Sequence, residues 1–244
     1  MLHHPTFLFW IDSMKRIWVS IFAFTCASAT ILAAATAIAG ETITISVERS
    51  DQGAMVRVGD ELFAEYRTHS GHQPIIWPLH GPTGKPVTRG FPMTPLGEHE
   101  LDDHPHHRSL WFAHGDVNGH DFWLEPNEQH GAGNCHIRHR DFVQVEVVNG
   151  HGEIVARNDW MAGDQRVCAD ERTWKFAADK DTRTIDFTIR LHASDGDLTF
   201  GDTKEGTFSV RVAGSMKVDA ALGGTVLNDS GDRNRQAWGK GARW

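Results

Sequence analysis

Short apolar runs of period two recur along this chain between clusters of turn residues, and this pattern limits what the chain can fold into. Residues 42–48 alternate strictly between apolar and polar side chains, as a half-buried strand does. No segment carries an apolar stripe of period 3.6 longer than two turns, so helices are expected to be minor. The sequence therefore predicts an all-β fold, an antiparallel β-sandwich of one or two large sheets.

Turn residues separate the expected strands, and two junctions carry hairpin signals. Gly59-Asp60-Glu61 predicts one hairpin and Asn149-Gly150 predicts another. Gly and Pro recur so densely from Gly81 to Gly97 that regular structure is excluded there, which predicts a long loop. The expected strands are residues 42–48, 54–58, 62–66, 75–79, 109–114, 120–123, 136–148, 153–160, 172–176, 184–193 and 207–212.

The first 39 residues have the features of an N-terminal extension followed by a signal peptide. Met14-Lys15-Arg16 supplies positive charge, residues 17–38 an apolar run, and Ala37-Ile38-Ala39 a small-x-small cleavage site. An uncleaved membrane anchor is the alternative, because the run is about long enough to span a bilayer. The cleavage site favours removal, with Met14 as the true first residue. We therefore expect a periplasmic or secreted protein with no stable membrane span after residues 1–39 are removed.

Residues 40–244 are expected to form a single β-sandwich domain, since a chain of this length can bury a large core. The formal net charge of -8 and the absence of a basic stripe argue against a nucleic-acid partner. The sequence has no Gly-rich phosphate loop, no Gly-x-Ser-x-Gly elbow and no Cys-x-x-Cys pair. Several common enzyme classes are therefore disfavoured.

Two cysteines, Cys135 and Cys168, remain after the signal peptide. In an exported protein this even number permits one disulfide. Two unpaired, partly buried thiols are the alternative, because nothing in the sequence fixes the distance between them. The sequence leaves both readings open.

Histidine is concentrated in one part of the chain. Of 16 histidines, 12 lie between His69 and His139, and residues 102–123 hold five of them. The same stretch contains Arg108 and large aromatic residues. A core strand would have to pair each buried titratable group, whereas this mixture suits a polar ligand with apolar faces. Residues 102–123 are therefore the predicted site.

Two histidine pairs in this stretch have spacings that metal sites use. His104 and His106 form a His-x-His pair, and His114 with Asp116 forms a second pair two residues apart. If residues 109–113 are extended, His106 and His114 lie about 26 Å apart at about 3.3 Å per residue, beyond the reach of one ion. We therefore assign no metal ligands, and the sequence leaves the cofactor open.

The same extended geometry predicts a groove for a sugar. Arg108, Leu110, Phe112 and His114 would share one face of the strand, with a basic group and an imidazole separated by apolar surface. Trp111 would then face the core.

Structural roles are the alternatives for several residues of this stretch. Asp103, His107 and Asp121 could equally belong to a hydrogen-bond network within the loop, and Trp77 and Trp123 could serve only core packing.

The motifs of this stretch carry a family resemblance. Six motifs resemble those of the secreted bacterial family catalogued as methane oxygenase PmoA. They are WPL at 77–79, GKPVTRG at 84–90, HPHHR at 104–108, WFAHGDVNG at 111–119, DFW at 121–123 and TKEG at 203–206. The resemblance covers roughly residues 42–244. It implies a galactose-mutarotase-like supersandwich. Members of that family continue beyond the equivalent of Trp244, so we expect the sandwich to be incomplete at its C-terminus.

The preferred hypothesis is a carbohydrate-active protein, an epimerase or lyase, that takes a small sugar or a polysaccharide. In this hypothesis His106 or His114 transfers a proton, and Arg108 and Asn118 hold hydroxyl or carbonyl oxygens of the ligand. A non-catalytic carbohydrate-binding sandwich and the metal-dependent oxygenase that the family name implies are the alternatives. The predicted catalytic residues are His106, His107, Arg108 and His114, and the predicted substrate-binding residues are His104, Asp116, Asn118, Asp121 and Trp123.

Overall fold

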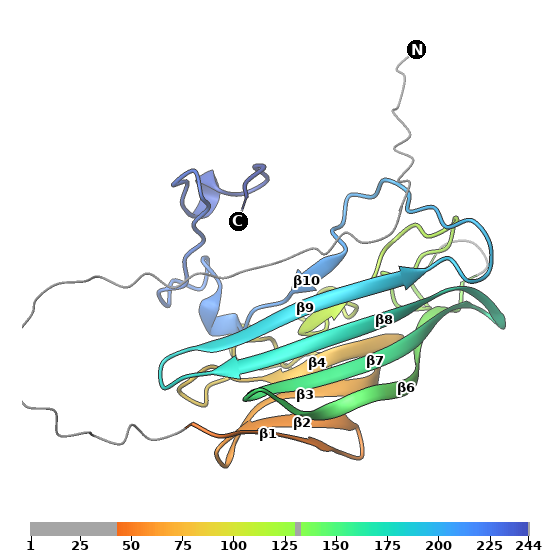
Figure 1. Ribbon diagram of the computed structural model, residues 1–244. Helices are drawn as coiled ribbons and strands as arrows, with labels where there is room; N and C mark the ends of the chain where they lie inside the picture. Colours follow the sequence, from red (N-terminus) through yellow and green to blue (C-terminus); the bar gives the residue numbers. More distant parts are fainter. Residues whose placement is uncertain (1–42, 130–132, 244) are drawn as a thin grey trace, which may run out of the picture.

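The chain folds into two antiparallel β-sheets in the computed structural model, which describes residues 43–129 and 133–243 (Figure 1). The predicted signal peptide and its cleavage site lie outside the described residues. The predicted all-β sandwich of antiparallel sheets is confirmed. The helical elements among the described residues are two single 3-10 turns, η1 (Gly214–Met216) and η2 (Asn234–Gln236).

The first sheet has six strands in the order β1-β2-β3-β4-β5-β10. Its last two members are far apart in sequence, yet β10 pairs antiparallel with β5 through Phe208 opposite Phe112. The strands are β1 (Ile45–Arg49), β2 (Gly53–Val58), β3 (Glu61–Ser70), β4 (Gln73–Leu79), β5 (Leu110–Phe112) and β10 (Phe208–Val210).

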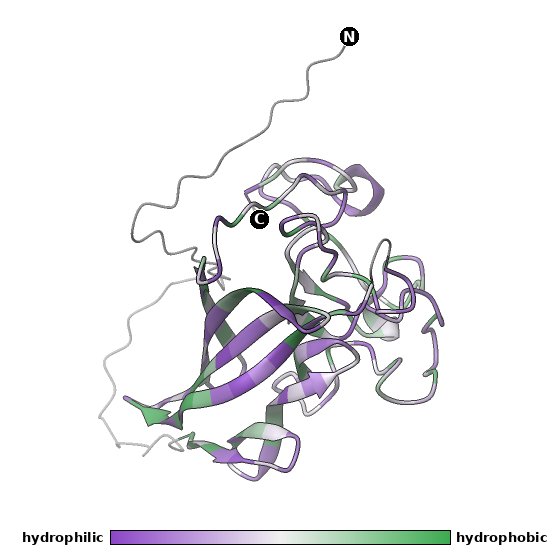
Figure 2. Cartoon of the chain, turned by 90° about the vertical axis from the view of Figure 1, so that its right-hand side faces the viewer, coloured by the Kyte–Doolittle hydropathy of each residue, from purple (hydrophilic) through white to green (hydrophobic). Residues whose placement is uncertain are grey.

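The second sheet is a four-stranded meander in the order β6-β7-β8-β9. Asn149 and Gly150 both have positive φ, 51° and 80°, as the predicted tight turn between β6 and β7 requires. Hydrophilic and hydrophobic residues alternate along the long strands (Figure 2). The strands are β6 (Cys135–Val148), β7 (His151–Ala162), β8 (Gln165–Ala178) and β9 (Arg183–His192).

Some strand boundaries differ from the sequence prediction. Residues 120–123 form no strand; a single bridge joins Val117 to His120, and the chain then bends. The strand expected at 109–114 shortens to β5, because Ser109 has a φ of 61° and breaks the extended backbone. The segment from Gly81 to Gly97 is irregular, as its Gly and Pro content predicts.

Apolar side chains between the sheets form two adjoining core clusters. One is centred on Phe63, whose ring meets Phe176 edge-on with centroids 5.6 Å apart. The other contains Trp160 and both cysteines. Cys135 and Cys168 are free thiols, so the unpaired alternative holds, and burial raises the pKa of Cys168 to about 12.

A buried polar network connects the two sheets within this core. Asp170 on β8 accepts hydrogen bonds from Asn158 at 2.6 Å, Trp160 at 2.7 Å and Arg172 at 2.8 Å. Tyr66 on β3, in the other sheet, donates to the Asn158 side chain at 3.2 Å. Burial raises the pKa of Tyr66 above its ordinary value, so the hydroxyl stays protonated and remains a donor.

No helix among the described residues is both long and apolar enough to cross a membrane.

On the rim of the six-stranded sheet, β10 exposes the apolar side chains of Phe208 and Val210.

Replacing Asp170 should destabilise the sandwich strongly. Asp170→Asn keeps the shape but removes the charge, and it leaves the guanidinium of Arg172 buried without its counter-ion. Loss of one partner of a buried ion pair costs about 3–5 kcal/mol. Urea unfolding should show this loss, whereas the exposed control Glu146→Gln on β6 should change the free energy of unfolding by less than about 0.5 kcal/mol. Equal midpoints for the two variants would contradict the assignment.

Candidate functional site

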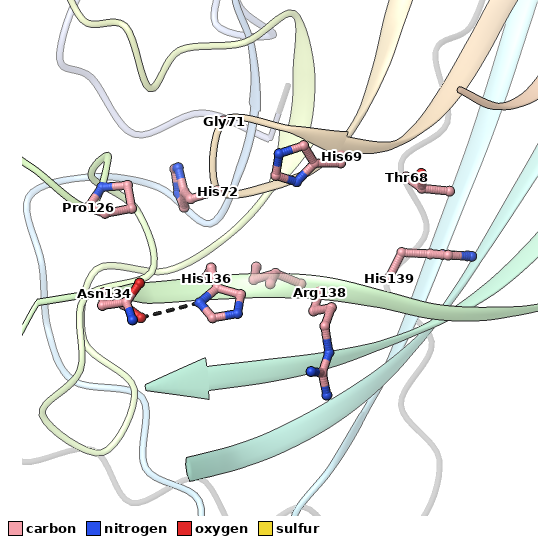
Figure 3. A pocket seen from close by; sticks show the side chains of 10 residues that line it. Thr68, His69, Gly71, His72, Pro126, Asn134, His136, Arg138 and His139 are labelled. Atoms are coloured by element: carbon pink, nitrogen blue, oxygen red, sulfur yellow. Dashed lines mark hydrogen bonds between the residues drawn. The ribbon is translucent and has the colours of Figure 1, made fainter. Parts of the chain in front are cut away.

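An open cleft lies where the turn between β3 and β4 meets the start of β6 (Figure 3). The backbone N–H of Ile137 donates to the carbonyl of His72 at 2.8 Å, which joins the two sheets at this point. The cleft has a volume of about 460 Å³, within the range of about 300–1,000 Å³ usual for small-ligand sites. Its lining is rich in imidazole, with His69, His72, His136 and His139.

An ion-pair network lies behind one wall of this cleft. Arg108 donates from Nε to Glu125 at 2.6 Å and from Nη1 to the Ser70 hydroxyl at 3.3 Å. The other carboxylate oxygen of Glu125 lies 3.3 Å from Nδ1 of His72, whose Nε2 donates to the Phe122 carbonyl at 2.9 Å. Burial alone would raise the pKa of Glu125, but His72 and Arg108 together hold it below its ordinary value. The Glu125 carboxylate therefore stays ionised, and its contacts with Arg108 and His72 fix the cleft wall.

Glycine is required at position 71 for two independent reasons. Gly71 has a φ of 65°, a conformation that side chains disfavour. A Cβ atom there would lie 2.5 Å from Nε of Arg108 and 2.7 Å from Oε1 of Glu125. The turn therefore closes directly over the ion pair, and this contact places His72 at the cleft.

Two imidazoles of the cleft lie on opposite sides of it. Figure 3 shows His69 at the end of β3 and His136 at the start of β6. Nδ1 of His136 donates to the Asn134 carbonyl at 3.2 Å, so Nε2 of the neutral ring carries the lone pair. The exposed ring of His69 has no hydrogen-bond partner among the described residues. Both rings are thus available to a ligand.

The three histidines of the HPHHR motif pack together outside the cleft lining. His104 stacks on His107 with ring centroids 4.7 Å apart, and His106 meets His107 edge-on at 4.5 Å. His107 also stacks on Trp111 at 5.3 Å, and Trp111 contacts Trp123 at 5.3 Å. His104, His106 and His107, the histidine cluster, therefore cover two buried tryptophans.

Arg89 holds the loop that carries the histidine cluster. It is only 2% exposed, and its guanidinium donates at 2.8–3.2 Å to four main-chain carbonyls and to a carboxylate. These acceptors are the carbonyls of Leu101, Asp103, His104 and His107 and the side chain of Asp103. One buried side chain thereby binds four carbonyls of a segment without secondary structure, and Arg211 adds hydrogen bonds to Asp103.

Burial keeps two rings of the cluster neutral. Burial lowers the pKa of His106, although Glu128, 3.0 Å from its Nδ1, opposes the shift. Burial lowers the pKa of His107 to about 3, and the neighbouring histidines and Arg211 add to this effect. Arg211 donates to Nδ1 of His107 at 3.4 Å, and the buried Nε2 has no partner among the described residues.

His114 and Asp116, two further predicted site residues, stabilise a neighbouring segment. Nε2 of His114 donates to the Gly201 carbonyl at 2.9 Å, and its ring lies against Phe200. A carboxylate oxygen of Asp116 accepts the Gly119 N–H at 2.9 Å. Within the described residues, no hydrogen bond or ring contact connects either side chain to the histidine cluster.

Asn118, Asp121 and Trp123 also have structural contacts. The Asn118 amide accepts from the Thr199 N–H at 2.7 Å and donates to the Asp197 carbonyl at 2.8 Å. Asp121 accepts the backbone N–H of Trp123 at 2.7 Å, and Trp123 is 3% exposed. The observed contacts are therefore those of the structural alternatives, a hydrogen-bond network within the loop for Asp121 and core packing for Trp123.

The prediction that Leu110 and Phe112 share an open groove face with Arg108 and His114 is wrong. Leu110 and Phe112 are buried between the sheets, where Phe112 packs against Trp160 and Phe187. The physical reason is that β5 lies inside the six-stranded sheet, so the face it turns toward the second sheet must be apolar. Trp111 is buried as expected, but beneath the histidine cluster.

No group of three or more His, Cys, Asp or Glu side chains in residues 43–129 and 133–243 is arranged to hold a metal ion. The His-x-His pair does not lie on an extended strand, because His104 has a φ of 46° and begins a turn. The strand geometry that made this pair a metal candidate is therefore absent.

Four cleft histidines were not selected from the sequence, although a signal for them was present. The histidine-rich region begins at His69 and ends at His139, and these two residues, with His72 and His136, line the cleft. Among the site residues predicted from the sequence, Arg108 is connected to the cleft, because it binds Glu125, which contacts His72. Proximity in sequence favoured residues 102–123, whereas the cleft forms between segments separated by more than 60 residues.

The fold and the site together define a two-sheet β-sandwich protein with an imidazole-lined cleft at the junction of its sheets. The chain belongs to a family of unknown function, DUF6807, whose profile matches residues 54–244. No curated protein and no solved structure matches the chain.

The neutral state of His107 predicts a dependence of stability on pH. Between pH 6.5 and 3 the unfolded chain binds a proton at this residue and the folded chain does not, so stability should fall as the pH falls. His107→Gln should remove up to about 1.4 kcal/mol per pH unit of this slope. Urea unfolding at pH 7, 6, 5 and 4 measures it, with the exposed His192→Gln as control. Parallel slopes for wild type and His107→Gln would contradict the assignment.

Proposed function

We propose that this DUF6807 protein is an exported, PmoA-like, carbohydrate-active protein that binds a sugar in the cleft and transfers a proton to or from it. The observation that supports this most is the placement of His69 and His136 on opposite sides of one ligand-sized cleft. Imidazole changes charge near neutral pH, which makes it the natural acid and base for such a step.

His136 is the proposed base. Its Nδ1–H is bound to the Asn134 carbonyl, so Nε2 can accept a proton from a sugar carbon that lies next to a carbonyl or carboxylate group. The electron pair of the broken C–H bond moves onto that group. When the protonated form of His69 donates its own proton to the opposite face, the product is an epimer; when a neighbouring C–O bond breaks instead, that proton goes to the leaving oxygen. Either course conserves protons and electrons.

The Arg108–Glu125–His72 network is a positioning element in this proposal. Arg108 and Glu125 are mostly buried, with side chains 14% and 10% exposed, and they hold the turn on which His72 and Gly71 lie. A rigid wall keeps the two reactive rings at a constant separation, which proton transfer across a ligand requires. Arg108 therefore acts through His72 and Gly71, and a direct contact of Arg108 with the ligand is not needed.

The histidine cluster lies outside the cleft and has no assigned step in this reaction. His106 is 5% exposed and lies outside the cleft lining, so proton transfer by His106 stays a prediction that the geometry of the cleft does not require. The side chain of His104 is 52% exposed, so its ring is accessible to solvent. A non-catalytic sugar-binding sandwich would use the same cleft without proton transfer.

Solvent deuterium exchange tests the proposal. The full chain is incubated in D₂O with a panel of aldoses, ketoses and sugar acids, and deuterium at carbon is followed by NMR. We expect wild type to exchange at least one sugar, and His136→Ala to reduce the rate by about 100-fold or more. His192→Ala, an exposed histidine on β9, is the matched control and should keep the full rate.

Two outcomes would contradict the assignment. Sugar binding without any exchange would identify a binding protein, which is the alternative from another functional class. Exchange that survives His136→Ala and His69→Ala but disappears in His106→Ala would return the reaction to the histidine cluster.

A further inference from the structure

A second hollow adjoins the cleft. It has a volume of about 630 Å³ and shares Thr68 and His139 with the cleft, so the two hollows lie side by side and are together called the groove. The groove extends from Asn134 at one end to Arg49 and Asp51 at the other. A single sugar at His69 and His136 would occupy only the first part of it.

Arg49 is positioned at the far end of this groove with its charge unused. Its guanidinium lies 3.9 Å from the centroid of the Phe142 ring, a cation–π contact that fixes its location. Its side chain makes no hydrogen bond or ion pair with any described residue, and Arg49 is exposed. Stacking orients the flat face of the guanidinium and leaves its N–H edge for an acceptor.

Most other charges of the second hollow are already paired. Arg140 donates to Asp141 at 2.9 Å and to the buried Asp159 at 3.3 Å, and Asp141 also lies 3.7 Å from Arg157. Of the two acids that line the second hollow, Asp51 is exposed and has no ion pair with a described residue.

The three arginines of the groove lining differ in what they bind. Arg138 and Arg140 both lie within ion-pair distance of the buried Asp159, and Arg140 also binds Asp141. Among these three arginines, Arg49 is therefore the one without an ion pair to a described carboxylate. A guanidinium of this kind attracts an anion.

We propose that the groove binds an acidic oligosaccharide of two or more units, with a carboxylate of one unit held by Arg49 while the next unit lies between His69 and His136. The inference rests on the proposed function, because the cleft must hold a sugar for the second hollow to hold its neighbour. An extended ligand would reach across both adjoining hollows, and a carboxylate accepts both N–H groups on the open edge of a guanidinium.

Calorimetric titration of the full chain tests this inference with defined probes. The probes are tetragalacturonate, galacturonate and the neutral chain cellotetraose. We expect tetragalacturonate to bind most tightly, and Arg49→Ala to weaken it by about 10-fold or more, the usual effect of losing a charge-assisted hydrogen bond. Galacturonate should be weakened less than tetragalacturonate by Arg49→Ala, because Arg49 lines the second hollow and not the cleft. Arg57→Ala, an arginine on β2 outside the groove lining, is the matched control.

The outcomes separate the two proposals. Unchanged tetragalacturonate affinity in Arg49→Ala, or cellotetraose binding as tight as that of tetragalacturonate, would overturn the inference while proton exchange dependent on His136 still supports the cleft. If none of the three probes binds and no sugar exchanges deuterium, both proposals fall.

Discussion

The carboxylate of Asp170 joins the two sheets where the cleft forms. It accepts from Asn158, Trp160 and Arg172 in the second sheet, and Asn158 in turn receives the hydroxyl of Tyr66 from the first. Because a buried charge without partners is strongly unfavourable, this arrangement permits one alignment of the sheets. Asn158 is directly opposite His139 in the β6–β7 pair, so the alignment also positions the cleft.

Irregular segments around the cleft are held in a similar way, by arginines rather than by strands. Arg89 binds the carbonyls of the loop that carries the histidine cluster, and Arg108 binds Glu125 beneath Gly71. A buried guanidinium offers five donors in a fixed plane and can satisfy several backbone carbonyls that no strand pairs. These two residues explain how so polar a segment remains ordered against a sandwich core.

Local pattern predicted most of the fold and little of the site. Alternation located the long strands, and Asn149-Gly150 located a hairpin, because both signals depend on neighbouring residues. The pairing of β10 with β5 and the bond from Ile137 to His72 connect distant segments, which periodicity does not report. The enrichment of histidine from His69 to His139 was visible in the sequence, but which of these histidines line the cleft depends on those long-range contacts.

The central claim, that ligands enter the cleft between His69 and His136, is tested most directly by NMR of the histidine side chains during titration with a sugar that binds. The account predicts that the ring signals of His69 and His136 shift on saturation, while those of His107 and His114, which are held by Arg211 and by the Gly201 carbonyl, do not. Shifts confined to the histidine cluster, with His69 and His136 unchanged, would contradict it.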